Sequence, residues 1–157
     1  MVSERSVTHS TFEIERHYDV GPARVFAAWA DPRIKARWFA GPDEWDRHGF
    51  EQDFRVGGRE SSRGGPPGGP VHIFDARYHD IVPDERVVFT YDLSLDERLI
   101  SVSLVTVELQ PDANGTRMVF TEQGAFLDGS DDGRDRRRGT GELLDALEAE
   151  LIRQQSP

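Results

Sequence analysis

Two short segments, each with a tryptophan and each opened by a proline, follow an alternating segment near the start of the chain. Residues 11–18 alternate Phe12 and Ile14 with Glu13 and Glu15, which is the two-residue period of a strand with one buried face. Pro22 and Pro32 then mark the first positions of two expected helices, because proline presets φ there. The sequence therefore predicts a strand followed by a helix-turn-helix-like elbow.

The apolar spacing within this elbow supports two short helices. Val25, Phe26 and Trp29 fall at i, i+1 and i+4, on one face of the first helix. Ile34 and Trp38 lie four residues apart on the same face of the second. Together the two helices are expected to form the elbow.

A series of strands is predicted after the elbow. Phe50, Phe54 and Val56 indicate the next strand, and Gly57-Gly58 supplies its turn before residues 59–62 return. Residues 64–70 are glycine and proline and are expected to form an exposed loop. Four β-branched and aromatic segments follow, with Asn114-Gly115 predicted as a hairpin turn: residues 71–82, 86–92, 100–110 and 117–123.

The C-terminal part predicts one helix. Residues 128–141 mix glycine, aspartate and arginine and are expected to form a solvated connector. Leu143, Leu144, Leu147 and Leu151 then recur at helical spacing. The order predicts an α+β fold, in which an antiparallel sheet of about six or seven strands wraps a long C-terminal helix, as one domain over residues 1–157 with its core in about 12–154.

Several of these motifs resemble the SRPBCC, or START-like, superfamily. They are Gly21-Pro22-Ala23, Asp31-Pro32, Trp38 and the run from Asp53 to Gly58. The resemblance is greatest to the AHSA-like branch, which is named for the activator of the heat-shock-protein-90 ATPase, and it extends from about Phe12 to Leu151. It implies the helix-grip fold of the birch-pollen allergen, with a cleft for an apolar or amphipathic small molecule.

One position departs from that family. Relatives usually have Gly-Trp at the start of the closing helix, whereas this chain has Gly139-Thr140. The smaller residue implies a wider cavity mouth.

Composition restricts the partners. The formal net charge of −10 disfavours nucleic acid and anionic membrane surfaces, and the absence of cysteine excludes disulfides, thiolate metal sites and a cysteine nucleophile. No segment has the apolar run of a signal peptide or a membrane span, so we expect no membrane insertion and a cytoplasmic protein. We further expect a monomer or homodimer.

Strand parity and helical spacing predict the residues that line the cleft, with ordinary core packing as the alternative for each. The predicted ligand-binding residues are Trp38, Phe54, Val56, Phe89, Tyr91, Val105, Val107, Met118, Phe120, Glu122, Leu144 and Leu147.

Glu122 and Tyr91 are the candidate catalytic residues. Glu122 follows Met118 and Phe120 at period two, so it would point into the cleft as a general base or a ligand-binding acid. The alternative is a carboxylate at the strand end, in solvent. The Tyr91 phenol could donate to a ligand carbonyl or to backbone. Arg55 is expected to face outward or to pair with Asp53 or Glu60.

Other site types find no support. The five histidines show no metal-binding spacing, and we expect neither a metal nor a cofactor; they are His9, His17, His48, His72 and His79. No nucleophile elbow or phosphate-binding loop is present.

Three functions remain open. The first is binding of a small hydrophobic or amphipathic ligand without catalysis. The second is a cyclase, aromatase or hydratase that uses Glu122 or Tyr91, as the superfamily resemblance implies. The third, implied by the name of the branch, is an interaction module that stimulates a chaperone ATPase.

Overall fold

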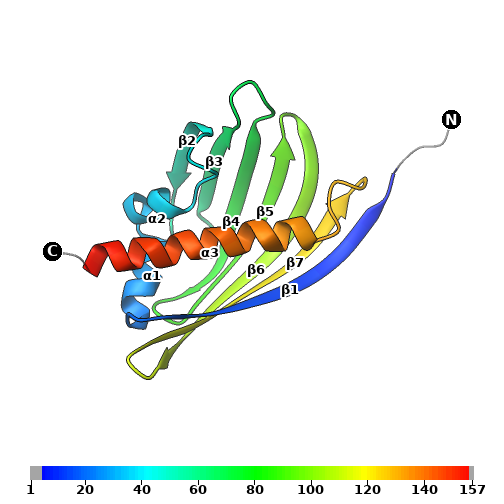
Figure 1. The fold of residues 1–157 in the computed structure, drawn as a ribbon. Coiled ribbons are helices and arrows are strands. Elements are labelled where there is room, and N and C mark those ends of the chain that lie inside the picture. The colour runs from blue at the N-terminus through cyan, green and yellow to red at the C-terminus, as the bar shows by residue number, and fades with distance from the viewer. Residues whose placement is uncertain (1–4, 156–157) are drawn as a thin grey trace.

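The computed structural model describes residues 5–155, and the ends of the expected domain, residues 1–4 and 156–157, lie outside the described residues. A seven-stranded antiparallel sheet curves around one long helix (Figure 1). This confirms the predicted α+β helix-grip fold. The elements are β1 (Val7–Tyr18), α1 (Pro22–Ala30), α2 (Pro32–Trp38), β2 (Asp46–Gln52), β3 (Arg59–Gly65), β4 (His72–Val82), β5 (Arg86–Leu95), β6 (Arg98–Asp112), β7 (Gly115–Leu127) and α3 (Arg134–Gln155).

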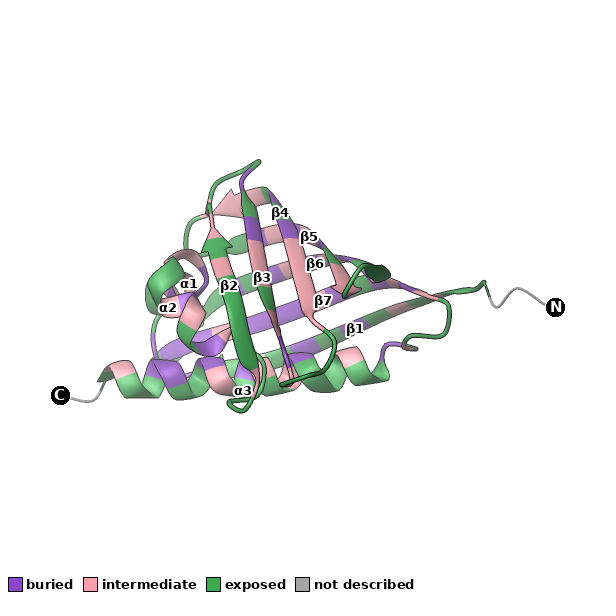
Figure 2. Ribbon diagram, turned by 90° about the horizontal axis from the view of Figure 1, so that it is seen from above, coloured by how far each residue is buried: buried purple, intermediate pink, exposed green. Residues whose placement is uncertain are grey.

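The strand order is β1-β7-β6-β5-β4-β3-β2, so the first strand returns to pair with the last. β1 and β7 pair along their length, from Val7 opposite Leu127 to Tyr18 opposite Thr116. The other strands follow as consecutive hairpins. Their inward side chains alternate with solvated ones, and on α3 the buried positions lie mainly toward its C-terminal half (Figure 2).

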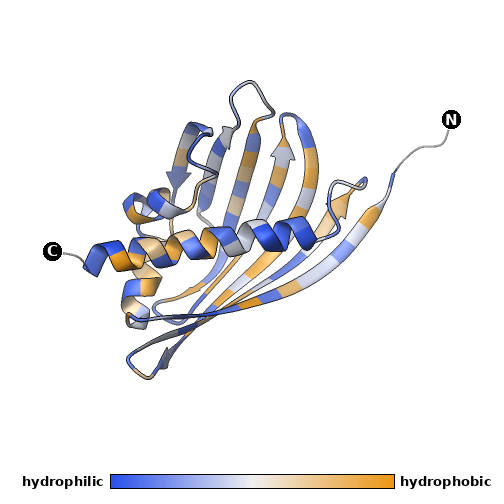
Figure 3. Cartoon of the chain, viewed as in Figure 1, coloured by the Kyte–Doolittle hydropathy of each residue, from blue (hydrophilic) through white to orange (hydrophobic). Residues whose placement is uncertain are grey.

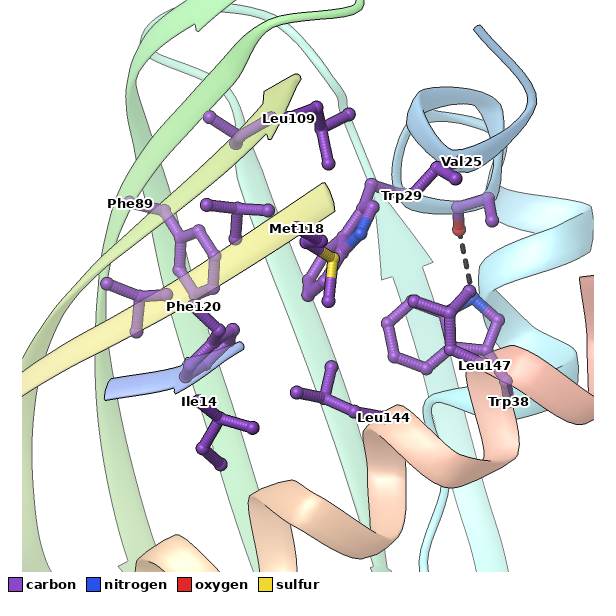
Figure 4. Packing of buried hydrophobic residues seen from close by; sticks show 14 of the residues in the cluster. Ile14, Val25, Trp29, Trp38, Phe89, Leu109, Met118, Phe120, Leu144 and Leu147 are labelled. Atoms are coloured by element: carbon purple, nitrogen blue, oxygen red, sulfur yellow. Dashed lines mark hydrogen bonds between the residues drawn. The ribbon is translucent and has the colours of Figure 1, made fainter. Parts of the chain in front are cut away.

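The α1–α2 elbow closes one end of the sheet. Pro22 and Pro32 stand at the helix starts, as predicted, and the Asp31 side chain accepts a hydrogen bond from the Arg33 N–H as the cap of α2. The indole of Trp38 donates to the Ala28 carbonyl (3.0 Å), and its ring meets that of Trp29 edge to face (Figure 4). The two helices are therefore joined through buried tryptophans.

The strand predicted from Phe50 to Val56 ends earlier than expected. β2 stops at Gln52, and residues 53–58 form the connection to β3. Phe54 still packs against Phe26 and Tyr78 from this connection, but Val56 is 61% exposed. The prediction that Val56 lines the cleft is therefore wrong, because strand parity does not hold in a turn.

Two glycine predictions also need correction. Gly64 and Gly65 belong to β3, and the loop begins only at Pro66. The β6–β7 turn consists of Ala113 and Asn114, with Ala113 at positive φ, and Gly115 is the first residue of β7. Gly115 is required for another reason: a Cβ there would lie 2.1 Å from the Tyr18 carbonyl oxygen.

The expected connector over residues 128–141 is instead half helix. α3 begins at Arg134, and the Asp131 carboxylate accepts hydrogen bonds from the backbone N–H groups of Gly133, Asp135 and Arg136. These bonds cap the helix start and allow a hydrophilic first section of α3, followed by an amphipathic one (Figure 3).

Candidate functional site

A cavity of about 720 Å³ lies between the inner face of the sheet, α2 and α3. Its volume falls in the range typical of small-molecule sites, roughly 300–1,000 Å³. Most of its lining is apolar. Six side chains from α1, the end of α2 and the residue after it, and the strands form what we call the aromatic wall: Trp29, Trp38, Phe39, Phe74, Phe89 and Phe120.

The rings of the aromatic wall support one another. Phe39 meets Phe74 with ring centroids 5.0 Å apart, and Trp29 stacks near Phe120 at 6.3 Å. On the opposite side, Leu143 and Leu144 of α3 complete the apolar lining. Such a surface favours an apolar or aromatic ligand body.

A polar cluster interrupts this lining near the start of α3. The Tyr91 hydroxyl donates to Glu122 Oε2 (2.7 Å), and Arg136 Nη1 donates to the Tyr91 oxygen (2.8 Å) and to Glu122 Oε2 (3.2 Å). Arg136 Nη2 donates to Ser101 Oγ (2.7 Å). We call Tyr91, Glu122, Arg136 and Ser101 the polar cluster.

The sheet places these residues together across three strands. Tyr91 on β5 lies opposite Ser103 on β6, which in turn lies opposite Gly124 on β7. Both neighbours are small, and a Cβ at Gly124 would come within 2.9 Å of the Phe126 ring. Tyr91 can therefore reach diagonally across β6 to Glu122.

Burial decides the electrostatics of the polar cluster. Glu122 is 1% exposed and the Arg136 side chain 12%. A lone carboxylate at such a depth would be costly, and Arg136 compensates its charge. Burial, followed by the neighbouring Glu122 charge, raises the pKa of Tyr91 well above its ordinary value, so the phenol remains a hydrogen-bond donor at neutral pH.

A second buried group lies behind the aromatic wall. Lys35 and Glu60 are each 1% exposed, and Lys35 Nζ donates to Glu60 Oε1 (2.6 Å). The Tyr78 hydroxyl donates to the same oxygen. Lys35 Nζ also lies 4.5 Å from the centroid of Phe39 and 5.3 Å from that of Trp29. Burial lowers the pKa of Lys35, and Glu60 opposes this shift.

A smaller cavity of about 330 Å³ adjoins the first beside β2 and β3. Trp45 and His72 line both cavities, with ring centroids 4.5 Å apart. Burial lowers the pKa of His72, and Asp96 opposes this shift. His72 is therefore neutral at pH 7.

The predicted lining residues divide into three groups. Six line the cavity: Trp38, Phe89, Tyr91, Phe120, Glu122 and Leu144. Four are completely or almost completely buried in the core and are not part of the lining: Val105, Val107, Met118 and Leu147. The remaining two, Phe54 and Val56, lie in the β2–β3 connection, outside the cavity.

Several other sequence expectations can be placed. Glu122 is buried in the polar cluster rather than in solvent. Arg55 is exposed and pairs with Asp53 (2.7 Å), as expected for it. Within residues 5–155, no group of three or more His, Cys, Asp or Glu side chains is arranged to hold a metal ion. In the same range, no helix has both the length and the apolar character needed to span a membrane.

Sequence reasoning missed Arg136, Lys35, Glu60 and Trp45. Arg136 lay in a run of mixed charge that was interpreted as a connector. A charged residue one position from Ile34 gave no sign of burial for Lys35, and Glu60 lay in the predicted return strand. The one available signal was Glu122 on an apolar face, since a buried carboxylate needs a cationic partner.

A family model for proteins described as Activator of Hsp90 ATPase homolog 1-like matches residues 19–151. No curated protein matches the chain in sequence.

Solved structures with the same fold include two from rhizobia. An uncharacterised protein from Rhizobium leguminosarum is 46% identical with a TM-score of 0.90, covering 95% of this chain and 98% of that one. The Mll3558 protein from Rhizobium loti is 50% identical with a TM-score of 0.86, covering 92% and 99%. The AHSA1-like protein from Aeromonas hydrophila, 22% identical with a TM-score of 0.71 and coverage of 92% and 94%, shares the fold.

Proposed function

The chain belongs to the Activator of Hsp90 ATPase homolog 1-like family, and we propose that it is a binding protein for an apolar or amphipathic small molecule. The observation that carries the proposal is the cavity of about 720 Å³, with its aromatic wall and the polar cluster near the start of α3. An apolar lining with few polar groups is the usual composition of a small-molecule site.

The polar cluster supports binding more directly than catalysis. Its hydroxyl, guanidinium and carboxylate already bond to one another, so they are fixed in place before a ligand arrives. Preorganised groups of this kind orient a ligand at little entropic cost.

The experiment is a thermal-shift and titration series with 2-naphthol as a probe. A ligand at about 100 times its Kd should stabilise the protein by about 2.7 kcal/mol. Thr140 is buried and lines the cavity, so Thr140→Trp should fill the space and abolish the shift. Arg138→Trp, on the exposed side of α3, is the matched control and should bind as the wild type does. Equal binding by both variants would contradict the proposal.

A catalytic role is the second candidate, and the Tyr91–Glu122 hydrogen bond at the cavity favours it. A protonated phenol beside a carboxylate is a pair suited to acid–base chemistry. If the site is catalytic, Glu122→Gln should abolish turnover of a bound compound without unfolding the protein. Unchanged turnover in that variant would remove this candidate.

A chaperone partner, the third possibility, has no specific observation in its favour beyond the family description. Adding the protein to a chaperone ATPase assay distinguishes it from the other two. A rate unchanged by the protein would remove it.

A further inference from the structure

The charges around the cavity are compensated in a way that selects among ligands. We propose that the cavity takes an uncharged ligand, with an apolar or aromatic body and one hydroxyl that donates to Glu122, and that it rejects carboxylates and ammonium groups of the same shape. This inference rests on the proposed binding function and goes further by naming the ligand class.

Arg136 is the largely buried cation of the cavity lining, and its charge is already compensated. A buried guanidinium would ordinarily attract a carboxylate ligand. Here it is already bonded to Glu122 Oε2, the Tyr91 oxygen and Ser101 Oγ. The charge that could bind an anion is therefore compensated within the protein.

The start of α3 is also closed to an anion, because Asp131 occupies it. Free N–H groups at a helix N-terminus form a potential anion site. The Asp131 carboxylate accepts from three of them, those of Gly133, Asp135 and Arg136. An incoming carboxylate would therefore meet another carboxylate at this position.

The remaining charges do not favour an anion either. His72, which also lines the cavity, is neutral at pH 7 because burial lowers its pKa. Asp135 pairs with Arg138 (3.2 Å), and Glu142 adds a further negative charge at the rim. A ligand carboxylate would thus lose its hydration without gaining a free cation, which is costly in an apolar site.

A cationic ligand meets the converse difficulty. Glu122 is the buried carboxylate of the lining, and Arg136 already neutralises it. An ammonium group placed beside Glu122 would also lie beside the guanidinium, and like charges repel.

An uncharged hydrogen-bond donor fits the second oxygen of Glu122. Glu122 Oε2 accepts from Tyr91 and Arg136, whereas no described residue donates a hydrogen bond to Oε1. A ligand hydroxyl can supply that bond and brings no charge to bury. The apolar body would then lie against the aromatic wall.

The test compares three probes of one shape: 2-naphthol, 2-naphthoate and 2-naphthylmethylammonium. At pH 7 the wild type should bind 2-naphthol at least tenfold more tightly than either charged probe, as measured by calorimetric titration. Equal or tighter binding of 2-naphthoate would overturn the inference and leave the proposed function intact. If no probe binds, the proposed function itself fails, and the inference with it.

Two variants assign the selectivity to the polar cluster. Glu122→Gln leaves Arg136 uncompensated and should raise the affinity for 2-naphthoate at least tenfold. Arg136→Gln leaves Glu122 uncompensated and should raise the affinity for the ammonium probe instead. Circular dichroism checks the fold of each, and either variant alone is informative because each should gain affinity for a probe of the opposite charge.

The matched control is Glu148→Gln, which makes the same change in net charge on an exposed part of α3, away from the cavity. Its probe affinities should equal those of the wild type. If Glu148→Gln gained as much 2-naphthoate affinity as Glu122→Gln, the overall charge of the protein would set the selectivity, and the inference would be overturned.

Discussion

Individual buried charges give this molecule its chemical character, and each is held by a specific partner. Glu122 has Arg136, and Glu60 has Lys35. Replacing both partners of such a pair by apolar residues is often tolerated, whereas removing one leaves a buried charge without compensation. Single and double substitutions at such a pair should therefore differ sharply in their effect on the free energy of unfolding.

Lys35→Met should lower the free energy of unfolding by about 3–5 kcal/mol, because Glu60 is left buried and unpaired. Urea denaturation measures the change. The double variant Lys35→Met/Glu60→Met should recover part of that loss. Arg33→Met, which removes an 87% exposed cation from the same helix, should change the free energy of unfolding far less than Lys35→Met does. Similar losses for Lys35→Met and Arg33→Met would show that the buried pair does not matter.

Secondary-structure elements position the cavity, and α3 contributes most to its open side. Its first turns carry Arg136, Gly139 and Thr140, while its later turns pack Leu147 and Leu151 into the core. The start of α3 depends on Asp131, because that carboxylate accepts hydrogen bonds from backbone N–H groups that have no acceptor within the helix.

Asp131→Ala should destabilise the protein by about 1 kcal/mol, the typical effect of losing a helix cap. It should also loosen Arg136, whose backbone N–H loses its acceptor. Asp131→Asn, which keeps one acceptor oxygen, should lose less stability. Urea denaturation gives the first quantity, and hydrogen exchange at the start of α3 gives the second. Unchanged exchange in Asp131→Ala would contradict the capping role.

His72 on β4 should make the stability depend on pH. Burial holds its pKa below the ordinary 6.5, so as the pH falls through 6.5 the unfolded chain takes up the proton first. The stabilisation is thus complete above pH 6.5 and is lost below it, down to the folded-state pKa. His72→Gln should reduce the slope of unfolding free energy against pH in this window. The same slope in wild type and variant would exclude His72 as its source.

How much of this could be predicted from the sequence depended on whether a signal was local. Pro22, Pro32 and the period of β1 are local, and the fold followed from them and from the family resemblance. Tyr91 and Glu122 were singled out by parity alone. Arg136 is 14 residues from Glu122 and contacts it only because α3 crosses the sheet, so no local pattern indicated the contact. Parity failed for Val56 because a turn interrupts the strand.

Across the whole molecule, the curved sheet and α3 enclose a space that the core does not fill. Val25, Met118 and Leu147 are fully buried in the core (Figure 4), while the aromatic wall and Leu143 line the cavity. The same fold thus contains a packed core and a cavity side by side. A ligand should therefore shift the NMR signals of leucines that line the cavity and leave those of core leucines unchanged.

The most direct measurement is the methyl NMR spectrum of leucine-labelled protein during titration with 2-naphthol. The methyl signals of four cavity leucines should shift in proportion to occupancy: Leu93, Leu95, Leu143 and Leu144. Those of Leu109 and Leu151, which are buried in the core away from the cavity, should hold their positions. A titration that moves none of the four cavity leucines, or moves the core leucines equally, would contradict a ligand-binding cavity under α3.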